Sequence, residues 1–581
     1  MSVLSFLVVL SLLLAGFGLL KADYKVLGGT FSGLAVAAFL ILMPWPAVFQ
    51  LARENRDFAA WFFPRRERVV LAWCVSSVLF GAAAGFGAAR LKAGKSPAER
   101  DIPEDGKTVD KKLASALKDR TPAAGTFLGV TRTGRAVSVL PVEREGHMQI
   151  VGPTRSGKSQ LLLALAAQDM ADGFPVFFME AKGDRGDFDQ FLKTAGRAGR
   201  VGDVRYFNPQ DSRSMTFNPI RPVSGQDPTA LANQVARAIG REPTSSGEGQ
   251  DYYRGVDYAK IQSMAEVFCA TGRAFTLRDC YDYFAFEEAR KKAFELCGDT
   301  KLSDLANSEF KSNEDTSSLT SALRPWTTGT LGALLNSYAP QIRLEEAFAR
   351  GQAVYFAVPV GHLQVLANPL GRMVISGLLS VAASRQRAAI KPKPATVIMD
   401  EFAEFATPVF ASFVATVGSA KMRTILSHQD LGQLKRIQGM DADAFNSVVF
   451  NNTSGCKVCF RAPDPEDAEF WAATLGTESS VSDTERVKSG LLGDEHTGDR
   501  SRREVEQFKI HPNRIKSLPP GVALVVAPGR ETCLIRTARV HGLIKDVALP
   551  ELAVVGEEPL DLRSAVKNFT KKLTATGEET K

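Results

Sequence analysis

The sequence predicts an α/β fold, in which a largely parallel β-sheet domain carries an inserted all-α segment and follows a hydrophobic N-terminal region. Three observations predict this architecture. Short apolar strands alternate with helical stretches over most of the chain. A glycine-rich loop, Gly152–Ser159, joins one of these strands to an apolar helix. Long runs near the N-terminus contain no charged side chain.

The first 91 residues, 1–91, are predicted to be a transmembrane region. Residues 2–20, 26–52 and 69–89 contain no Asp, Glu, Lys or Arg. Each run is near the roughly 20 residues that a helix needs to cross the hydrocarbon core of a bilayer. A cleaved signal peptide is disfavoured, because the first run lacks a basic start and two more runs follow. Two spans and three spans both stay open, since three would place the arginine-rich 53–68 loop outside, against the positive-inside rule.

The overall composition permits several partners and excludes a disulfide-stabilised secreted domain. The chain has 71 basic and 64 acidic residues, a net charge of +7, which permits a polyanionic partner without requiring one. Its seven cysteines are scattered, which suits a reducing compartment. Cys456 and Cys459 form a lone C-x-x-C within a predicted strand, where their side chains point to opposite faces. They are predicted to be core cysteines rather than metal ligands.

Changes in charge and in hydrophobic periodicity divide the rest of the chain into five predicted segments. They are a polar juxtamembrane linker at 92–122, a sheet domain at 123–224, an all-α insertion at 225–345, the remainder of the sheet domain at 346–555, and a tail at 556–581.

The sheet domain is expected to contain short buried strands. The apolar runs that predict them are 147–151, 175–180, 204–209, 353–359, 396–400, 423–430, 456–462 and 521–528. Residues 477–508 are polar and are predicted to be an exposed, partly disordered loop.

The glycine-rich loop carries the clearest chemical signal. GPTRSGKS matches the phosphate-binding pattern G-x-x-x-x-G-K-S and lies between a predicted strand and a predicted helix. Two glycines let the backbone N–H groups face phosphates, and the helix N-terminus adds partial positive charge. Lys158 is predicted to contact the β- and γ-phosphates of ATP, and Ser159 to bind Mg²⁺. The predicted nucleotide-binding residues are Gly152, Pro153, Thr154, Arg155, Ser156, Gly157, Lys158 and Ser159.

Two other strand ends supply the polar groups that such a loop needs. The strand at 396–400 ends in Asp400, which is predicted to hold Mg²⁺, and Glu401, which is predicted to polarise the attacking water. The strand at 423–430 carries Gln429 near its end. This amide is predicted to hydrogen-bond the γ-phosphate or the attacking water.

Taken together, these segments resemble the type IV secretion coupling proteins of the TraD and TraG kind. The resemblance covers most of residues 125–545. The stretches that carry it are GPTRSGKS, VIMDEFAEF, SHQDLGQL, NNTSGCKVCFRAPDPEDAEF and LPPGVALVVAPGR. It implies a hexameric RecA-like motor, related to FtsK and HerA, with a DNA channel along the ring axis. It also implies a multi-pass protein of the bacterial inner membrane with its ATPase domain in the cytoplasm.

The resemblance further implies a set of partners and a role in conjugation. These partners are single-stranded DNA, the relaxase within its relaxosome, and the inner-membrane proteins of the type IV secretion channel. Two alternatives are an ATPase that exports only protein substrates and an inactive P-loop adaptor that recruits substrate. The intact Lys158, Asp400 and Glu401 argue against the adaptor.

One departure from the family pattern concerns the arginine finger, a basic residue that a neighbouring subunit donates to the nucleotide. Many relatives place an arginine before the strand that ends in glutamine, whereas Ser419 and Ala420 stand there in this sequence. Arg423 is the first candidate because it opens that strand and keeps a guanidinium. Lys421 and Arg461 follow it.

Overall fold

The structure is a computed structural model, and it describes part of the chain. The described residues are 106–118, 125–223, 227–242, 250–312, 315–387, 392–404, 413–414, 416–435, 453–490, 493–540, 547–549 and 557–568. The chain divides into two compact units, Met1–Asp101 and Ile102–Lys581. The predicted transmembrane spans fall in the first unit and lie outside the described residues.

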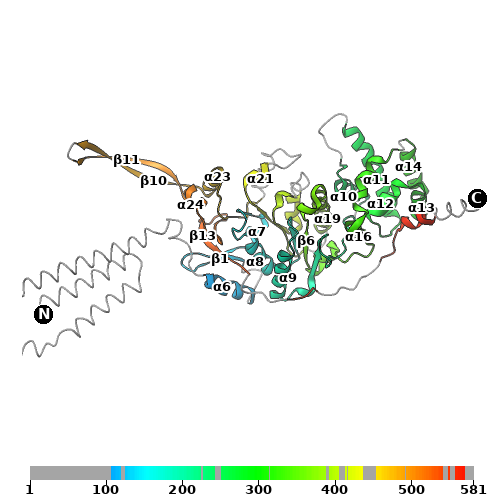
Figure 1. The fold of residues 1–581 in the computed structure, drawn as a ribbon, viewed down its shortest axis with the longest axis horizontal. Coiled ribbons are helices and arrows are strands. Elements are labelled where there is room, and N and C mark those ends of the chain that lie inside the picture. The colour runs from blue at the N-terminus through cyan, green and yellow to red at the C-terminus, as the bar shows by residue number, and fades with distance from the viewer. Residues whose placement is uncertain are drawn as a thin grey trace, which may run out of the picture. The chain divides into compact units, whose positions relative to one another are not determined.

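A mixed sheet of eleven strands forms the centre of the second unit, and it confirms the predicted α/β fold class (Figure 1). Its strand order is β2-β1-β13-β12-β9-β3-β8-β7-β4-β6-β5. The seven strands from β9 to β5 are mutually parallel. They are β3 (Met148–Val151), β4 (Val176–Glu180), β5 (Val204–Phe207), β6 (Ala353–Ala357), β7 (Ala395–Met399), β8 (Met422–His428) and β9 (Cys456–Cys459).

An antiparallel group of four strands extends the sheet beyond β9. It comprises β1 (Thr126–Val130), β2 (Ala136–Val139), β12 (Val522–Val526) and β13 (Cys533–Thr537). The sequence predicted β12 as a strand but gave no sign of its direction. Antiparallel neighbours need only short connections, and six residues, 527–532, join the end of β12 to the start of β13.

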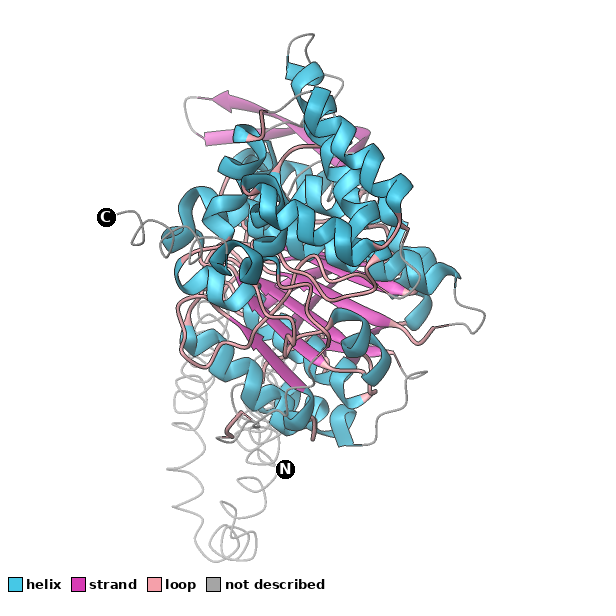
Figure 2. Ribbon diagram, turned by 90° about the vertical axis from the view of Figure 1, so that its right-hand side faces the viewer, coloured by secondary structure: helices cyan, strands magenta, loops and turns pink. Residues whose placement is uncertain are grey.

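Helices cover both faces of the sheet (Figure 2), so the parallel strands are buried on both sides. In β4, Val176 and Phe178 join one apolar core while Phe177 and Met179 join the other. The helices flanking the sheet are α6 (Gly106–Lys118), α7 (Pro141–Glu145), α8 (Lys158–Ala171), α9 (Arg185–Arg197), α17 (Leu344–Arg350), α18 (Val360–Leu363), α19 (Ala367–Arg387), α21 (Leu431–Lys435), α23 (Pro465–Leu475) and α24 (Pro512–Lys516).

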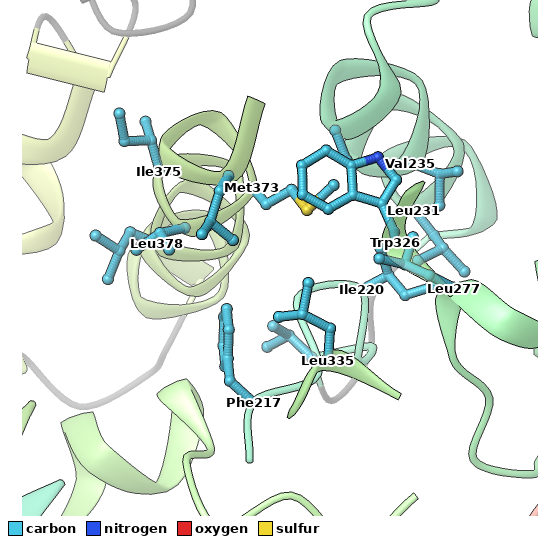
Figure 3. Packing of buried hydrophobic residues seen from close by; sticks show 14 of the residues in the cluster. Phe217, Ile220, Leu231, Val235, Leu277, Trp326, Leu335, Met373, Ile375 and Leu378 are labelled. Atoms are coloured by element: carbon cyan, nitrogen blue, oxygen red, sulfur yellow. The ribbon is translucent and has the colours of Figure 1, made fainter. Parts of the chain in front are cut away.

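Between β5 and β6 the described chain is mainly helical. The helices are α10 (Pro228–Ile239), α11 (Gln250–Ala270), α12 (Leu277–Ala285), α13 (Glu287–Cys297), α14 (Thr300–Ser312), α15 (Ser317–Leu323) and α16 (Gly329–Leu335). They share one apolar core with α19, in which Trp326 points toward Met373 beside Leu231 and Val235 (Figure 3). This core joins the helical insertion, residues 228–335, to one face of the sheet.

One described helical run, Val360–Arg387, is long and apolar enough to cross a membrane by length and composition. However, 61% of its most apolar window is buried inside the protein. It is therefore placed as a core helix, which agrees with the apolar residues that α19 contributes to the insertion core.

Two segments differ from the sequence-based expectation. Residues 477–508, predicted to be a loop, form the two-stranded antiparallel arm β10 (Thr477–Gly490) and β11 (Gly493–Phe508). Part of the predicted tail, residues 557–568, packs against the helical insertion, with Leu560 and Leu562 buried. The physical reason is that two leucines at alternate positions can enter an apolar core from an extended chain.

Candidate nucleotide-binding site

The phosphate-binding loop joins β3 to α8, as the sequence predicts. A Cβ atom on Gly152 would lie 2.6 Å from Cβ of Phe460, so no larger residue fits there. Gly157 has φ of 112° and caps the N-terminus of α8, a conformation that L side chains rarely adopt. Both glycines of the motif are therefore required by the observed geometry: one for close approach and one for its backbone angle.

The strand order brings the predicted metal ligands together. β8 lies between β3 and β7, so the carboxyl ends of all three parallel strands meet at one edge. Ser159 Oγ donates a hydrogen bond to Asp400 Oδ2 at 3.2 Å, and Ser427 Oγ donates to Asp400 Oδ1 at 2.9 Å. Ser427 was not predicted. It orients the carboxylate from the neighbouring strand, and a serine near a strand end gave no specific signal in the sequence.

Glu401 lies next to the ammonium group of the loop lysine. Its Oε1 is 3.9 Å from Lys158 Nζ and accepts a hydrogen bond from Gln429 Nε2 at 3.0 Å. Burial raises the pKa of Glu401, although the Lys158 charge opposes this. Within the described part of the chain, Glu401 Oε2 is buried without a hydrogen-bond partner. The carboxylate thus keeps one oxygen available for another donor, such as a water molecule.

Lys158 folds back over the loop, where Nζ donates to the carbonyl oxygen of Gly152. Burial lowers its pKa, and the nearby Glu401 and Asp400 carboxylates oppose that effect. Only 5% of its surface is exposed. A buried ammonium whose own contacts are a carbonyl and a 3.9 Å carboxylate is well suited to receive additional negative charge.

A cavity of about 250 Å³ opens in front of the loop. Its lining contains one cation that the sequence analysis missed, Lys182, in the turn after β4. Burial lowers the pKa of Lys182, but the carboxylates of Asp400 and Glu401 outweigh burial and raise it overall. The available signal was a polar run, EAKGD at 180–184, directly after a buried strand.

Glu180, the last residue of β4, holds the turn that carries Lys182. Its carboxylate accepts hydrogen bonds from the backbone N–H groups of Lys182 and Gly183, the latter at 2.9 Å. The hydroxyl of Tyr355 donates to it from β6 at 3.3 Å. Burial raises the pKa of Glu180 to about 7, despite the two backbone hydrogen bonds.

Arg423, the first candidate for the arginine finger, does not lie with these residues of its own chain. It starts β8, whereas Gln429 follows the end of that strand at the opposite edge of the sheet. Arg423 is only 7% exposed and lies over the ring of Phe174, with 5.6 Å between Cζ and the ring centroid. A side chain donated to a neighbouring subunit must reach the surface, and this one is enclosed in its own chain.

The other two finger candidates differ in placement. Lys421 lies at the same edge as Arg423 and forms an ion pair with Glu145 at 2.9 Å. Arg461 is exposed and follows β9, whose Cys459 pairs with Val151 of β3. Arg461 therefore lies at the edge of the sheet that carries the phosphate-binding loop.

The residues present fit a nucleotide with Mg²⁺. The loop ends at the N-terminus of α8, where backbone N–H groups can bind phosphate oxygens, and Ser159 with Asp400 offers two hard oxygen ligands. No group of three or more His, Cys, Asp or Glu side chains that could hold a metal occurs in the described part of the chain. For a Mg²⁺ ion held by Ser159 and Asp400, phosphates and waters would complete the coordination.

The fold and these contacts define an α/β protein with a P-loop. Residues 394–520 match the family described as "TraM recognition site of TraD and TraG". This match confirms the resemblance of the chain to type IV secretion coupling proteins. Comparison of the sequence with curated proteins found no match.

Several solved structures are similar to this chain at low sequence identity. The unbound bacterial conjugative coupling protein TrwB is 17% identical, over 77% of this chain and 94% of that chain, with a TM-score of 0.49. TrwB in complex with ADP and Mg²⁺ is 18% identical over 77% and 94%, with a TM-score of 0.47. VirB4 of Thermoanaerobacter pseudethanolicus is 14% identical over 71% and 96%, with a TM-score of 0.47.

Proposed function

We propose that this protein is a membrane-anchored ATPase that couples the relaxase–DNA complex to a type IV secretion channel and drives single-stranded DNA transfer. One observation carries the proposal. The family match at 394–520 contains Asp400, Glu401 and Gln429, and the fold brings these residues against Lys158 and Ser159. The segment matched by the family thus supplies three of the polar side chains at the P-loop site.

In this proposal each residue has a separate role. Lys158 neutralises charge on the β- and γ-phosphates, and Ser159 with Asp400 holds Mg²⁺. Glu401 accepts a proton from the attacking water through its unbonded Oε2, while Gln429 positions its other oxygen. Bound Mg²⁺ would supply electrostatic stabilisation of the transferred phosphoryl group.

Hydrolysis by the purified full-length chain in detergent, with and without single-stranded DNA, tests the function. We expect DNA to stimulate hydrolysis, and we expect the stimulation to fall steeply with salt, because Lys and Arg contacts to phosphates release counterions. Lys158→Ala is the control for contaminating ATPases. A hydrolysis rate that does not change when DNA is added would favour an ATPase that exports only proteins. A chain that binds ATP but does not hydrolyse it would favour an adaptor.

The proposed assembly is a hexameric ring in which neighbouring subunits share active sites. We propose Arg461 as the basic residue donated across the interface, because its side chain is exposed at the edge of the sheet that carries the P-loop. Subunits with Arg461→Ala keep their own P-loop, and subunits with Lys158→Ala keep Arg461. Activity recovered on mixing the two inactive variants would support donation between subunits. Rings that form without recovery would reject Arg461.

A further inference from the structure

The C-terminal segment, residues 557–568, lies on the helical insertion as a short extended chain, 557–561, followed by a helix at 562–568. Pro559 forms an isolated parallel bridge with Ala274. The N–H of Ala274 donates to the carbonyl of Glu558 at 2.9 Å, and the N–H of Leu560 donates to the carbonyl of Ala274 at 2.7 Å. A peptide that adds to an exposed strand edge is held by the same pattern of main-chain bonds.

Two leucines anchor this segment. Leu560 and Leu562 are 1% and 0% exposed, and both belong to the apolar core of the insertion. The N–H of Leu562 donates to Asp279 Oδ1 at 3.1 Å. Lys292 Nζ donates to the carbonyl of Asp561, between the two leucines, at 2.6 Å. Alternate residues thus enter the core while the backbone between them is held by polar groups.

Charges at both ends fix the direction of the segment. Glu557 pairs with Arg221 at 2.6 Å, and Glu558 pairs with Arg273 at 2.7 Å. At the other end, Arg563 pairs with Asp282 at 2.8 Å. Reversing the peptide would place like charges together at both ends, so the three pairs specify one orientation.

The ion pairs lie near the surface. The side chain of Glu558 is 70% exposed and that of Arg273 is 30% exposed. Beside them a cavity of about 520 Å³ is lined by Asn218, Phe268 and Tyr338, among others. The segment therefore occupies a groove whose charged end is open, rather than a site enclosed on every side.

We propose that this groove, formed by Arg221, Arg273, Ala274, Asp279 and Asp282, is a peptide-recognition site. Its ligand is an extended peptide with an acidic pair, leucines at alternate positions and a following arginine. The protein's own C-terminal segment is the resident, releasable occupant. Release of that segment opens the groove to a partner peptide of the same chemistry. This inference does not depend on ATP hydrolysis.

The first test uses the full-length chain and a labelled synthetic peptide of residues 557–568. The double variant Leu560→Asp/Leu562→Asp releases the segment, since a buried carboxylate in an apolar core is strongly disfavoured. We expect the released variant to bind the peptide at least about tenfold more tightly than the wild-type chain, in which the resident segment reduces the competent fraction. A folded variant that binds no better than the wild type would overturn the proposal.

A charge exchange keeps the proposal testable if the double variant does not fold. Arg273→Glu alters a partly exposed side chain and leaves both leucines in place. On this chain, a peptide carrying Glu558→Lys should bind about tenfold more tightly than the wild-type peptide, and on the wild-type chain the preference should reverse. Equal binding of the two peptides to both chains would show that the segment is not recognised through this groove.

Discussion

The two edges of the parallel sheet both contain buried charge, but they arrange it differently. At the amino edge, Arg144 pairs with Asp169, where the Nη2–Oδ2 distance is 2.8 Å, and Thr396 donates to the same oxygen at 2.9 Å. At the carboxyl edge, Lys158 and Glu401 are 3.9 Å apart, and Glu401 Oε2 has no hydrogen-bond partner among the described residues.

The difference separates a structural ion pair from a candidate catalytic site. Burial alone would raise the pKa of Asp169, but the Arg144 guanidinium outweighs burial and lowers it. At the other edge burial prevails and raises the pKa of Glu401. Both oxygens of the Asp169 carboxylate are bonded within the chain, whereas the Glu401 carboxylate beside the cavity keeps one oxygen available to a ligand.

The largest expected effect is loss of hydrolysis in Lys158→Ala. The ammonium group would stabilise transition-state charge, and removing one such preorganised donor typically lowers kcat about 10²–10³-fold. Steady-state hydrolysis and circular dichroism of the same sample measure activity and folding together. If the variant hydrolysed ATP at the wild-type rate, Lys158 would have no role in catalysis.

The second largest effect is expected for Glu401→Gln, because Gln has nearly the shape of Glu but cannot act as a base. We expect nucleotide binding to persist and kcat to fall about 10²–10⁴-fold. Because the replaced carboxylate is buried and lies beside Asp400, we also expect Tm to stay constant or to rise. If the variant lost nucleotide binding but kept its turnover per bound ATP, the proposed role of Glu401 as the base would be wrong.

The matched test at the amino edge is Arg144→Leu. This change leaves Asp169 buried and unpaired, which typically costs about 3–5 kcal/mol of stability. We expect a lower Tm with hydrolysis unchanged at temperatures where the variant remains folded. The double variant Arg144→Leu/Asp169→Leu should recover much of the lost stability, since it removes both buried charges. If either folded variant lost kcat without losing stability, the Arg144–Asp169 pair would have a catalytic role, and the two edges would not differ as proposed.

The sequence predicted the local chemistry well and the long-range placement less well. The P-loop and the Asp400–Glu401 pair were recognisable because each motif is contiguous and follows a buried strand. Lys182 was missed because its place depends on β4 lying next to β7, which the sheet order decides. The sequence shows that Arg423 starts a strand, but not that its guanidinium lies over the ring of Phe174 inside the chain.

The C-terminal segment was missed for a related reason. Leu560 and Leu562 alternate, but two leucines in a mixed-charge stretch also fit a solvated tail. Only the groove beside Ala274, assembled from residues nearly 300 positions earlier in the sequence (559 − 274 = 285), shows why this stretch is ordered. Local periodicity can identify a segment that is able to pack, but only the three-dimensional fold shows which residues it packs against.

The smallest expected effect is a change in the pH dependence of stability when Glu180, the last residue of β4, is replaced. Burial raises its pKa from 4.5 to about 7, so the folded protein binds a proton that the unfolded chain has released. The resulting contribution to stability is fully present below about pH 4.5 and is lost as the pH rises through about 7. A shift of this size corresponds to a contribution on the order of 3 kcal/mol.

Glu180→Gln removes this titration while keeping a group of similar shape. We therefore expect the fall in Tm between pH 5 and pH 8 to be smaller in the variant than in the wild-type chain. The Gln side chain has one carbonyl oxygen in place of two carboxylate oxygens, so the turn that carries Lys182 should also be held less firmly. Glu145→Gln, a change of an exposed carboxylate, is the matched control. If both variants keep the wild-type pH dependence, Glu180 does not titrate in this range, and the turn beneath Lys182 is held in one protonation state throughout.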